Sequence, residues 1–154
     1  MHRNAVHIQQ VLAELGLPGE VRQLADSART AAQAAAALGV PVGAICSSLV
    51  FLLAGEPLLV LTSGAHRVDT ELLGAALGGT ITRADADAVR AATGQPIRGV
   101  APVGHPAPVR TVIDKDLGEF DIVWAAAGHP HAVFPTNFAE LVQVTGGEPR
   151  FVGA

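Results

Sequence analysis

Three small side chains that could carry chemistry stand together where an apolar segment begins. Cys46, Ser47 and Ser48 open the run "CSSLVFLL". A hydrolytic serine needs a strained turn, a neighbouring base and oxyanion donors, and the G-x-S-x-G pattern typical of such a turn is missing. We therefore interpret the two serines as small polar residues at a sheet edge. We expect the thiol of Cys46 to be buried and unreactive.

Four of the six histidines fall in segments that we expect to be loops: His66, His105, His129 and His131. The pair in "HPH" could offer two metal ligands, but no set of Glu, Asp or Cys residues stands near it at ligand spacing. We therefore predict no metal site and no other cofactor. One or two of these imidazoles are interpreted as hydrogen-bonding groups that line a pocket.

The segment "IRGVAPVGHP" (residues 97–106) is the most informative loop. Its glycines and prolines predict a rigid wall whose main-chain N–H and C=O groups are accessible to a small ligand. It is not a phosphate-binding P-loop, because no Gly-Lys-Ser/Thr follows. From the residues alone, a surface connection without any role remains an equal alternative.

The composition limits the classes of protein that fit. The chain has 154 residues, is 49% hydrophobic and 16% charged, and carries a net charge of −4. These values predict a folded domain and disfavour a protein that coats DNA or other long nucleic acid. A single cysteine excludes an internal disulfide, and neither an apolar leader nor a run of about 20 apolar residues is visible. A cytoplasmic location without a membrane partner is expected.

The pattern of apolar residues, caps and breakers predicts the elements that must position these groups. Helices are expected at residues 4–15, 30–39, 69–78, 85–94 and 137–146, and strands at 20–24, 47–54, 57–63, around 79–83, and at 109–113, 122–127 and 131–134. The segment "EPRFVGA" is either a frayed end or a short added strand. Helices and hairpins alternate without a regular βαβ order, which favours an α+β fold with a mixed sheet in one domain, residues 1–154.

Several blocks in this order resemble one known family. They are "VGAICSSLVF", "LVLTSGAHRVD", "LGGTITRADADAVRAATG", "IRGVAPVGHP", "VRTVID", "AAAGHPHAVF" and "NFAELVQVTGG". Over residues 20–147 the chain is similar to the YbaK/EbsC-like proteins, relatives of the editing domain of bacterial prolyl-tRNA synthetase. The resemblance implies a mixed, barrel-like curled β-sheet surrounded by helices. It also implies hydrolysis, in trans, of the ester that joins a wrong small amino acid to tRNA, often the tRNA for proline.

The resemblance also suggests the site. The family's Gly-x-x-x-Pro loop matches residues 98–102, with Arg98 in place of the first glycine, and its small-residue turn matches residues 127–129. The catalytic set implied is Ser47, Gly99, Pro102, Gly128 and His129. The substrate-binding set implied is Ser48, Arg67, Arg98, Val100, Ala101, His105 and Ala127. The implied partners are the acceptor end of aminoacyl-tRNA and prolyl-tRNA synthetase.

Ser47 departs from the family pattern. Where the family reads I-V-K-S/T-L-V-F, this chain reads I-C-S-S-L-V-F, so Ser47 stands where a lysine that meets the phosphate of the terminal adenosine is expected. Three outcomes are open: Arg98 or Arg67 supplies the charge, the substrate lacks that phosphate, or the chain binds without hydrolysis. The hypotheses are therefore a deacylase, a non-catalytic module that binds aminoacyl-tRNA ends or a synthetase, and, on the serines and histidines alone, a small-molecule esterase or metal hydrolase.

Overall fold

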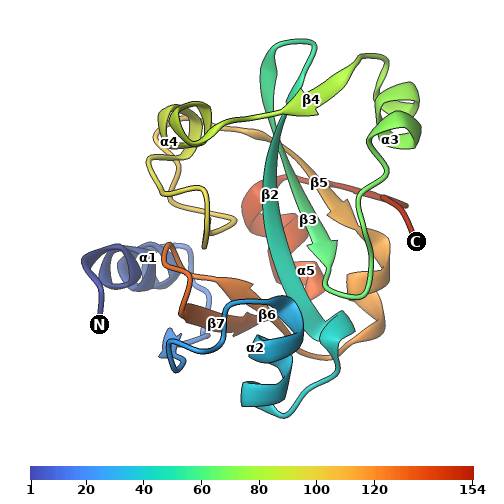
Figure 1. The fold of residues 1–154 in the computed structure, drawn as a ribbon. Helices are drawn as coiled ribbons and strands as arrows, with labels where there is room; N and C mark the ends of the chain where they lie inside the picture. The colour runs from blue at the N-terminus through green and yellow to red at the C-terminus, as the bar shows by residue number, and fades with distance from the viewer.

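Eight strands form one mixed sheet, with five α-helices around it, in the computed structural model, which describes residues 1–154 (Figure 1). The strands are β1 (Arg22–Gln23), β2 (Ile45–Leu53), β3 (Glu56–Ser63), β4 (Ile81–Arg83), β5 (Arg110–Asp114), β6 (Val123–Ala126), β7 (Ala132–Thr136) and β8 (Glu148–Arg150). The helices are α1 (Arg3–Glu14), α2 (Ala31–Leu38), α3 (Thr70–Leu77), α4 (Ala86–Thr93) and α5 (Phe138–Thr145), with 3-10 turns at Val42–Ala44 and Lys115–Glu119.

The sheet order is β1-β7-β6-β2-β3-β5-β8, and β4 pairs with β2 outside this order. The β2–β3, β2–β4, β6–β7 and β1–β7 pairs are antiparallel. The β2–β6, β3–β5 and β5–β8 pairs are parallel. The mixed α+β fold expected from the sequence is therefore confirmed. The sheet is open, because β1 and β8 at its two ends do not pair with each other.

The longest strand, β2, has a different pairing on each of its two edges. One edge pairs continuously with β3 from Cys46 to Leu53. The opposite edge changes partners: β6 pairs with Ile45 and Cys46, and β4 pairs with residues 51–53. No strand pairs with this side at residues 47–50. The sheet is split there, and main-chain groups of β2 have no ladder partner in the middle of the strand.

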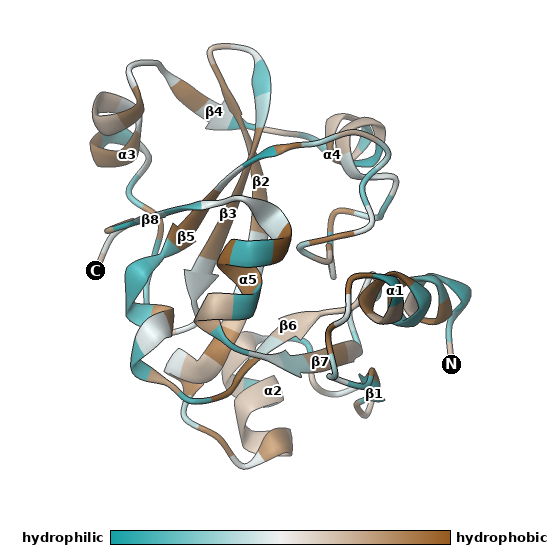
Figure 2. Cartoon of the chain, turned by 180° about the vertical axis from the view of Figure 1, so that it is seen from behind, coloured by the Kyte–Doolittle hydropathy of each residue, from teal (hydrophilic) through white to brown (hydrophobic).

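Helices cover the sheet and close its core. Figure 2 shows α5 lying over the face formed by β3 and β5. Leu141 of α5 and Ile8 of α1 are fully buried in the main core together with Leu59 and Leu61 of β3. The alanines of α2 form a second, smaller cluster with Ile45 of β2 and Val133 of β7, against which Trp124 of β6 packs. Their short side chains let this helix lie close to the strands beside the split in the sheet.

The local signals read from the sequence are present in the structure. Thr30 accepts a hydrogen bond from the backbone N–H of Gln33, whose side chain accepts in return from the backbone N–H of Thr30, so the capping box of α2 is complete. The segment between α4 and β5 is an ordered loop without regular structure. The C-terminal segment supplies β8, the short added strand. None of the helices is long and apolar enough to span a membrane.

Candidate active site

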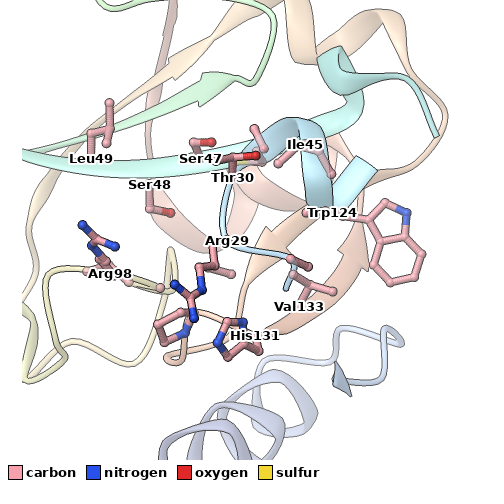
Figure 3. A pocket seen from close by; sticks show the side chains of 18 of the residues that line it. Arg29, Thr30, Ile45, Ser47, Ser48, Leu49, Arg98, Trp124, His131 and Val133 are labelled. Carbon is pink, nitrogen blue, oxygen red and sulfur yellow. The ribbon is translucent and has the colours of Figure 1, made fainter. Parts of the chain in front are cut away.

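A pocket of about 490 Å³ opens beside the unpaired side of β2 (Figure 3). It is lined by the start of α2, by β2, by the loop after α4, and by β6, β7 and the turn between them. The lining residues are Ala28, Arg29, Thr30, Ala31, Ala34, Ile45, Cys46, Ser47, Ser48, Leu49, Ile97, Arg98, Gly99, Val100, Trp124, Ala126, Pro130, His131 and Val133. The pocket therefore combines small apolar side chains with two arginines, hydroxyl groups and one imidazole.

The loop after α4 forms one wall because a buried amide holds it. Gln95 is 5% exposed; its Oε1 accepts from the backbone N–H of Ala101 at 2.7 Å, and its Nε2 donates to the carbonyl of Val103 at 3.1 Å. Ala101 and the following residues are thereby fixed in the core. Gly99 and Val100, just before them, line the pocket. The loop is a rigid wall of the pocket, and Gln95 is the residue that makes it rigid.

The turn between β6 and β7 contacts this wall directly. The backbone N–H of Gly128 donates to the carbonyl of Gly99 at 2.8 Å. On the other side of the turn, Asn4 of α1 donates from Nδ2 to the carbonyl of Gly128 at 3.2 Å. Gly99 has φ +86°, and a Cβ there would lie 2.6 Å from the nitrogen of Pro130. Only glycine allows the loop and the turn to approach this closely.

Two arginines place positive charge at the pocket. Arg29 precedes α2, where its Nε donates to the carbonyl of Asp26 at 3.3 Å, and Arg98 belongs to the loop after α4 (Figure 3). Neither guanidinium lies within 4.0 Å of a carboxylate. No Asp or Glu lines the pocket. The pocket is therefore electropositive at its rim and suits an anionic group such as phosphate.

The nucleophile-bearing residues at the start of β2 line this pocket. Desolvation by burial, assisted by the negative charge of Asp114, raises the pKa of the Cys46 thiol to about 12. This thiol is neutral at physiological pH and is not an activated nucleophile. Ser47 and Ser48 lie on the strand itself, and no imidazole is hydrogen-bonded to either hydroxyl. The geometry therefore provides no activated serine or cysteine.

The structure brings part of the predicted site together. Ser47, Ser48, Arg98, Gly99 and Val100 all line the pocket. Four others do not line it: Ala101, Pro102, Ala127 and Gly128 are buried in the loop and the turn, and Pro102 lines the separate groove that also contains His105. Ala101, Ala127 and Gly128 can shape the pocket without facing it.

The remaining three predicted residues point elsewhere. The ring of His129 packs against that of His2 with centroids 4.6 Å apart, outside the pocket. The Nε2 of His105 lies 2.8 Å from the carbonyl of Ala101, at a separate surface groove. Arg67 donates its backbone N–H to Ala154 at the C-terminus. Of the two arginines considered for the missing lysine, only Arg98 faces the pocket.

Sequence reasoning missed three polar residues of the pocket as site residues: Arg29, Thr30 and His131. Arg29 reaches it because the capping box at Thr30 fixes the start of α2 beside β2. His131 faces it from the turn, whereas His129, two residues earlier, faces α1. The local pattern "GHPH" does not tell which imidazole faces inward. The only available signal for Arg29 was its place directly before a helix cap.

A separate group of side chains could hold a metal ion. One ligand atom each of His66, Asp114 and Asp116 lies within 4.8 Å of the others. The Oδ2 of Asp114 already accepts from the backbone N–H of Ser63 at 3.0 Å and lies 2.7 Å from Nδ1 of His66. The Nε2 of His66 lies 3.5 Å from Asp116. The imidazole thus bridges two carboxylates, and the cluster ties the end of β3 to the end of β5.

Comparisons with known proteins show the family of the chain. Residues 25–144 match the model of the aminoacyl-tRNA editing domain. A solved structure described as a candidate trans-editing enzyme for prolyl-tRNA synthetase is 37% identical, with a TM-score of 0.95 over 100% of this chain and 99% of that one. A scaffold protein from a study of epitope backbone grafting gives the same values.

The hypothetical protein APE2540 is 29% identical, with a TM-score of 0.86 over 96% of this chain and 99% of that one. No curated protein matches the chain. The matched segment includes β2, the loop after α4 and the turn after β6, which together form the pocket. The chain belongs to the aminoacyl-tRNA editing domain family.

Proposed function

We propose that this protein is a trans-acting deacylase that hydrolyses the ester of a small amino acid mischarged on tRNA, with the tRNA for proline as the first candidate. The observation that carries the proposal is the pocket itself. It joins a small apolar compartment to two unpaired arginines at the split in the sheet, in a chain of the editing family.

The apolar part of the pocket suits a small side chain. Ala28, Ala34, Ile45 and Val133 line it, and no carboxylate is present. Such walls exclude a long or charged side chain by volume and by desolvation cost. A single methyl group changes selectivity by about 1–3 kcal/mol, so alanine and serine are the substrates to compare first.

An aminoacyl ester is already activated, and its hydrolysis needs no covalent nucleophile. The site must hold the ester, position a water molecule and stabilise the developing oxyanion. On the side of β2 away from β3, the main-chain groups at residues 47–50 have no ladder partner and face the split in the sheet, so the N–H groups on that side are candidate donors to the oxyanion. A mechanism without a covalent nucleophile is consistent with the neutral thiol of Cys46 and with serines that have no neighbouring base.

Arg29 and Arg98 supply the charge that the family lysine would provide at position 47. Each guanidinium can hold a phosphate through paired N–H groups. The pair would bind the phosphate of the terminal adenosine and so orient the ester toward β2. Arg67 does not take part, because it does not line the pocket and its backbone N–H donates to Ala154 at the C-terminus.

The test is deacylation of tRNA charged with alanine, serine, cysteine or proline by the purified protein. We expect release of at least one small amino acid and little release of proline from its own tRNA. The absence of release above the buffer rate for every charged tRNA, at high protein concentration, would reject the proposal.

Ser47 favours one second candidate, a module that binds aminoacyl-tRNA ends without hydrolysing them. Binding of an uncleavable, amide-linked aminoacyl-tRNA together with no hydrolysis of the ester would support this alternative. The binding measurement would also distinguish this alternative from a protein that has lost the site altogether, because such a protein would not bind the aminoacyl-tRNA. Prolyl-tRNA synthetase is the partner to add in that experiment, since the family suggests it.

A further inference from the structure

Two buried side-chain polar atoms in the whole chain lack a hydrogen-bond partner, and both belong to residues that line this one pocket. They are Oγ of Ser48 and Nδ1 of His131. A buried polar atom left without a partner costs about 1–3 kcal/mol of stability. Because both such atoms belong to the same cavity, they indicate groups that a bound substrate or water completes. Figure 3 shows the two side chains on facing walls of the pocket.

The imidazole of His131 has no hydrogen bond to a protein group. Its Nε2 lies 4.0 Å from Oδ1 of Asp26, and the two side chains are 16% and 93% exposed. The backbone N–H of His131 donates to Nδ1 of His129 at 3.2 Å. In the tautomer with its proton on Nε2, the nitrogen nearer Asp26, Nδ1 carries a lone pair that no protein group uses. In this tautomer the imidazole can accept a proton or a hydrogen bond at Nδ1.

No other side chain that lines the pocket can take up a proton near neutral pH. Arg29 and Arg98 are permanently charged. The hydroxyl groups of Thr30, Ser47 and Ser48 are not bases, and the Cys46 thiol is neutral. The pocket contains no carboxylate. Any proton that leaves the attacking water to a protein group therefore goes to His131.

We infer that His131 is the general base of the deacylation reaction. This inference rests on the proposed function. The oxygen of a water molecule attacks the ester carbonyl carbon while one water proton moves to Nδ1 of His131, and the carbonyl becomes an oxyanion. The intermediate then collapses, the bond from carbon to ribose oxygen breaks, and the proton passes from Nδ1 to that oxygen. The products are the free amino acid and the ribose hydroxyl, and the imidazole is neutral again.

The variant that tests this inference is His131→Asn, whose side-chain amide can hold a water at the position of Nδ1 but cannot take its proton. The matched control is His7→Asn, an exposed position on α1 that does not line the pocket. General-base catalysis contributes about a hundredfold to ten-thousandfold. We expect kcat of His131→Asn to fall within that range with KM nearly unchanged, and His7→Asn to stay within about threefold of wild type.

The pH profile adds a readout that a purely structural role would not change. The charged and titratable groups around His131 are Asp26, His129 with His2 beyond it, and the pocket arginines Arg29 and Arg98. For the wild type, kcat should rise with pH and then level off as the base loses its proton. For His131→Asn, the remaining rate should follow hydroxide concentration without levelling off.

The outcomes separate the inference from the function on which it rests. A wild-type protein without activity would overturn the proposed deacylase and this inference with it. An active wild type, together with a His131→Asn variant that keeps its kcat and its pH profile, would overturn only the role of His131. Binding of an uncleavable, amide-linked aminoacyl-tRNA by the variant shows that its pocket is intact. A variant that hydrolyses slowly but binds normally supports the inference.

Discussion

The backbone N–H of Gly128 donates a hydrogen bond to the carbonyl oxygen of Gly99 at 2.8 Å. This bond joins the loop after α4 to the turn after β6, although the two glycines are far apart in the sequence. Both have positive φ angles, +86° and +85°. The contact places Gly99, Pro130 and His131 around the same cavity, so the pocket depends on this close approach of two backbones.

Gly99→Ala should disrupt this contact. The new Cβ would lie 2.7 Å from the carbonyl oxygen of His129, and the left-handed backbone adds strain of about 1–3 kcal/mol. We expect a loss of stability in urea unfolding of more than 2 kcal/mol, with deacylation lost. Gly55→Ala is the control: its φ is +85°, but nothing lies within 4 Å of its Cβ. Equal losses of stability for the two variants would contradict the role of the close approach.

Arg29→Ala and Arg98→Ala should each weaken binding of aminoacyl-tRNA. A charge-assisted contact to phosphate contributes about 1.5–3 kcal/mol, so we expect the Kd to rise about ten- to hundredfold and its salt dependence to decrease. Fluorescence anisotropy with an amide-linked acceptor-stem mimic measures both. Arg110→Ala is the matched control, because Arg110 pairs with Glu148 at the β5–β8 edge. If all three variants bind alike, the pocket arginines do not hold the phosphate.

Ser47→Lys tests whether the arginines replace the family lysine. With Arg29 and Arg98 in place, the added charge should change kcat/KM of the wild type by less than about threefold, because the phosphate already has its partners. In the Arg98→Ala background, the same lysine should recover most of the loss, about tenfold. Steady-state deacylation of both pairs provides the comparison. A large gain in the wild-type background would instead identify a catalyst weakened by the loss of lysine.

The buried imidazole of His105 should make stability depend on pH. Desolvation by burial lowers the pKa of His105, and its hydrogen bond to the carbonyl of Ala101 opposes this only in part. His105 in the folded state therefore takes up a proton less readily than in the unfolded chain, where the pKa of histidine is about 6.5. As pH falls from about 7.5 to 5.5, the unfolding free energy should decrease.

The variant His105→Gln should reduce the loss of unfolding free energy at low pH. The neutral amide of glutamine can reach the carbonyl of Ala101 and carries no titrating proton. Part of the decrease should remain, because desolvation and the neighbouring His2 and His131 also lower the pKa of His129. Urea unfolding at the two pH values measures both effects. An undiminished pH effect in the variant would show that His105 is not a source of it.

Local patterns in the sequence were sufficient to predict the five helices and strands β1 to β7, but left β8 open. The capping box of Thr30 and Gln33 fixes the start of α2, and the glycine after each of the last four helices marks its end. These signals act between residues a few positions apart, so they can be read from a linear pattern. The order of the elements predicted a mixed sheet, but it did not predict that β2 pairs with both β6 and β4.

Only some of the residues that line the pocket could be predicted from the sequence. The family pattern points to Ser47, Ser48 and residues 98–100, all of which line the pocket. It also points to His129, which packs against His2, and does not point to Arg29 or His131. Side chains on a turn can face opposite sides two residues apart, and only the packing of α1 against that turn decides which one faces the cavity.

The sequence by itself determined the five helices, seven of the eight strands, the helix caps and the glycines that permit tight turns, because each depends on neighbours within a few residues. The tertiary structure alone decided which polar groups share one cavity. That cavity exists because β2 changes partners halfway along one side and leaves residues 47–50 unpaired on that side. The gap results from long-range pairing, which joins segments that are distant in the sequence and have no local signature.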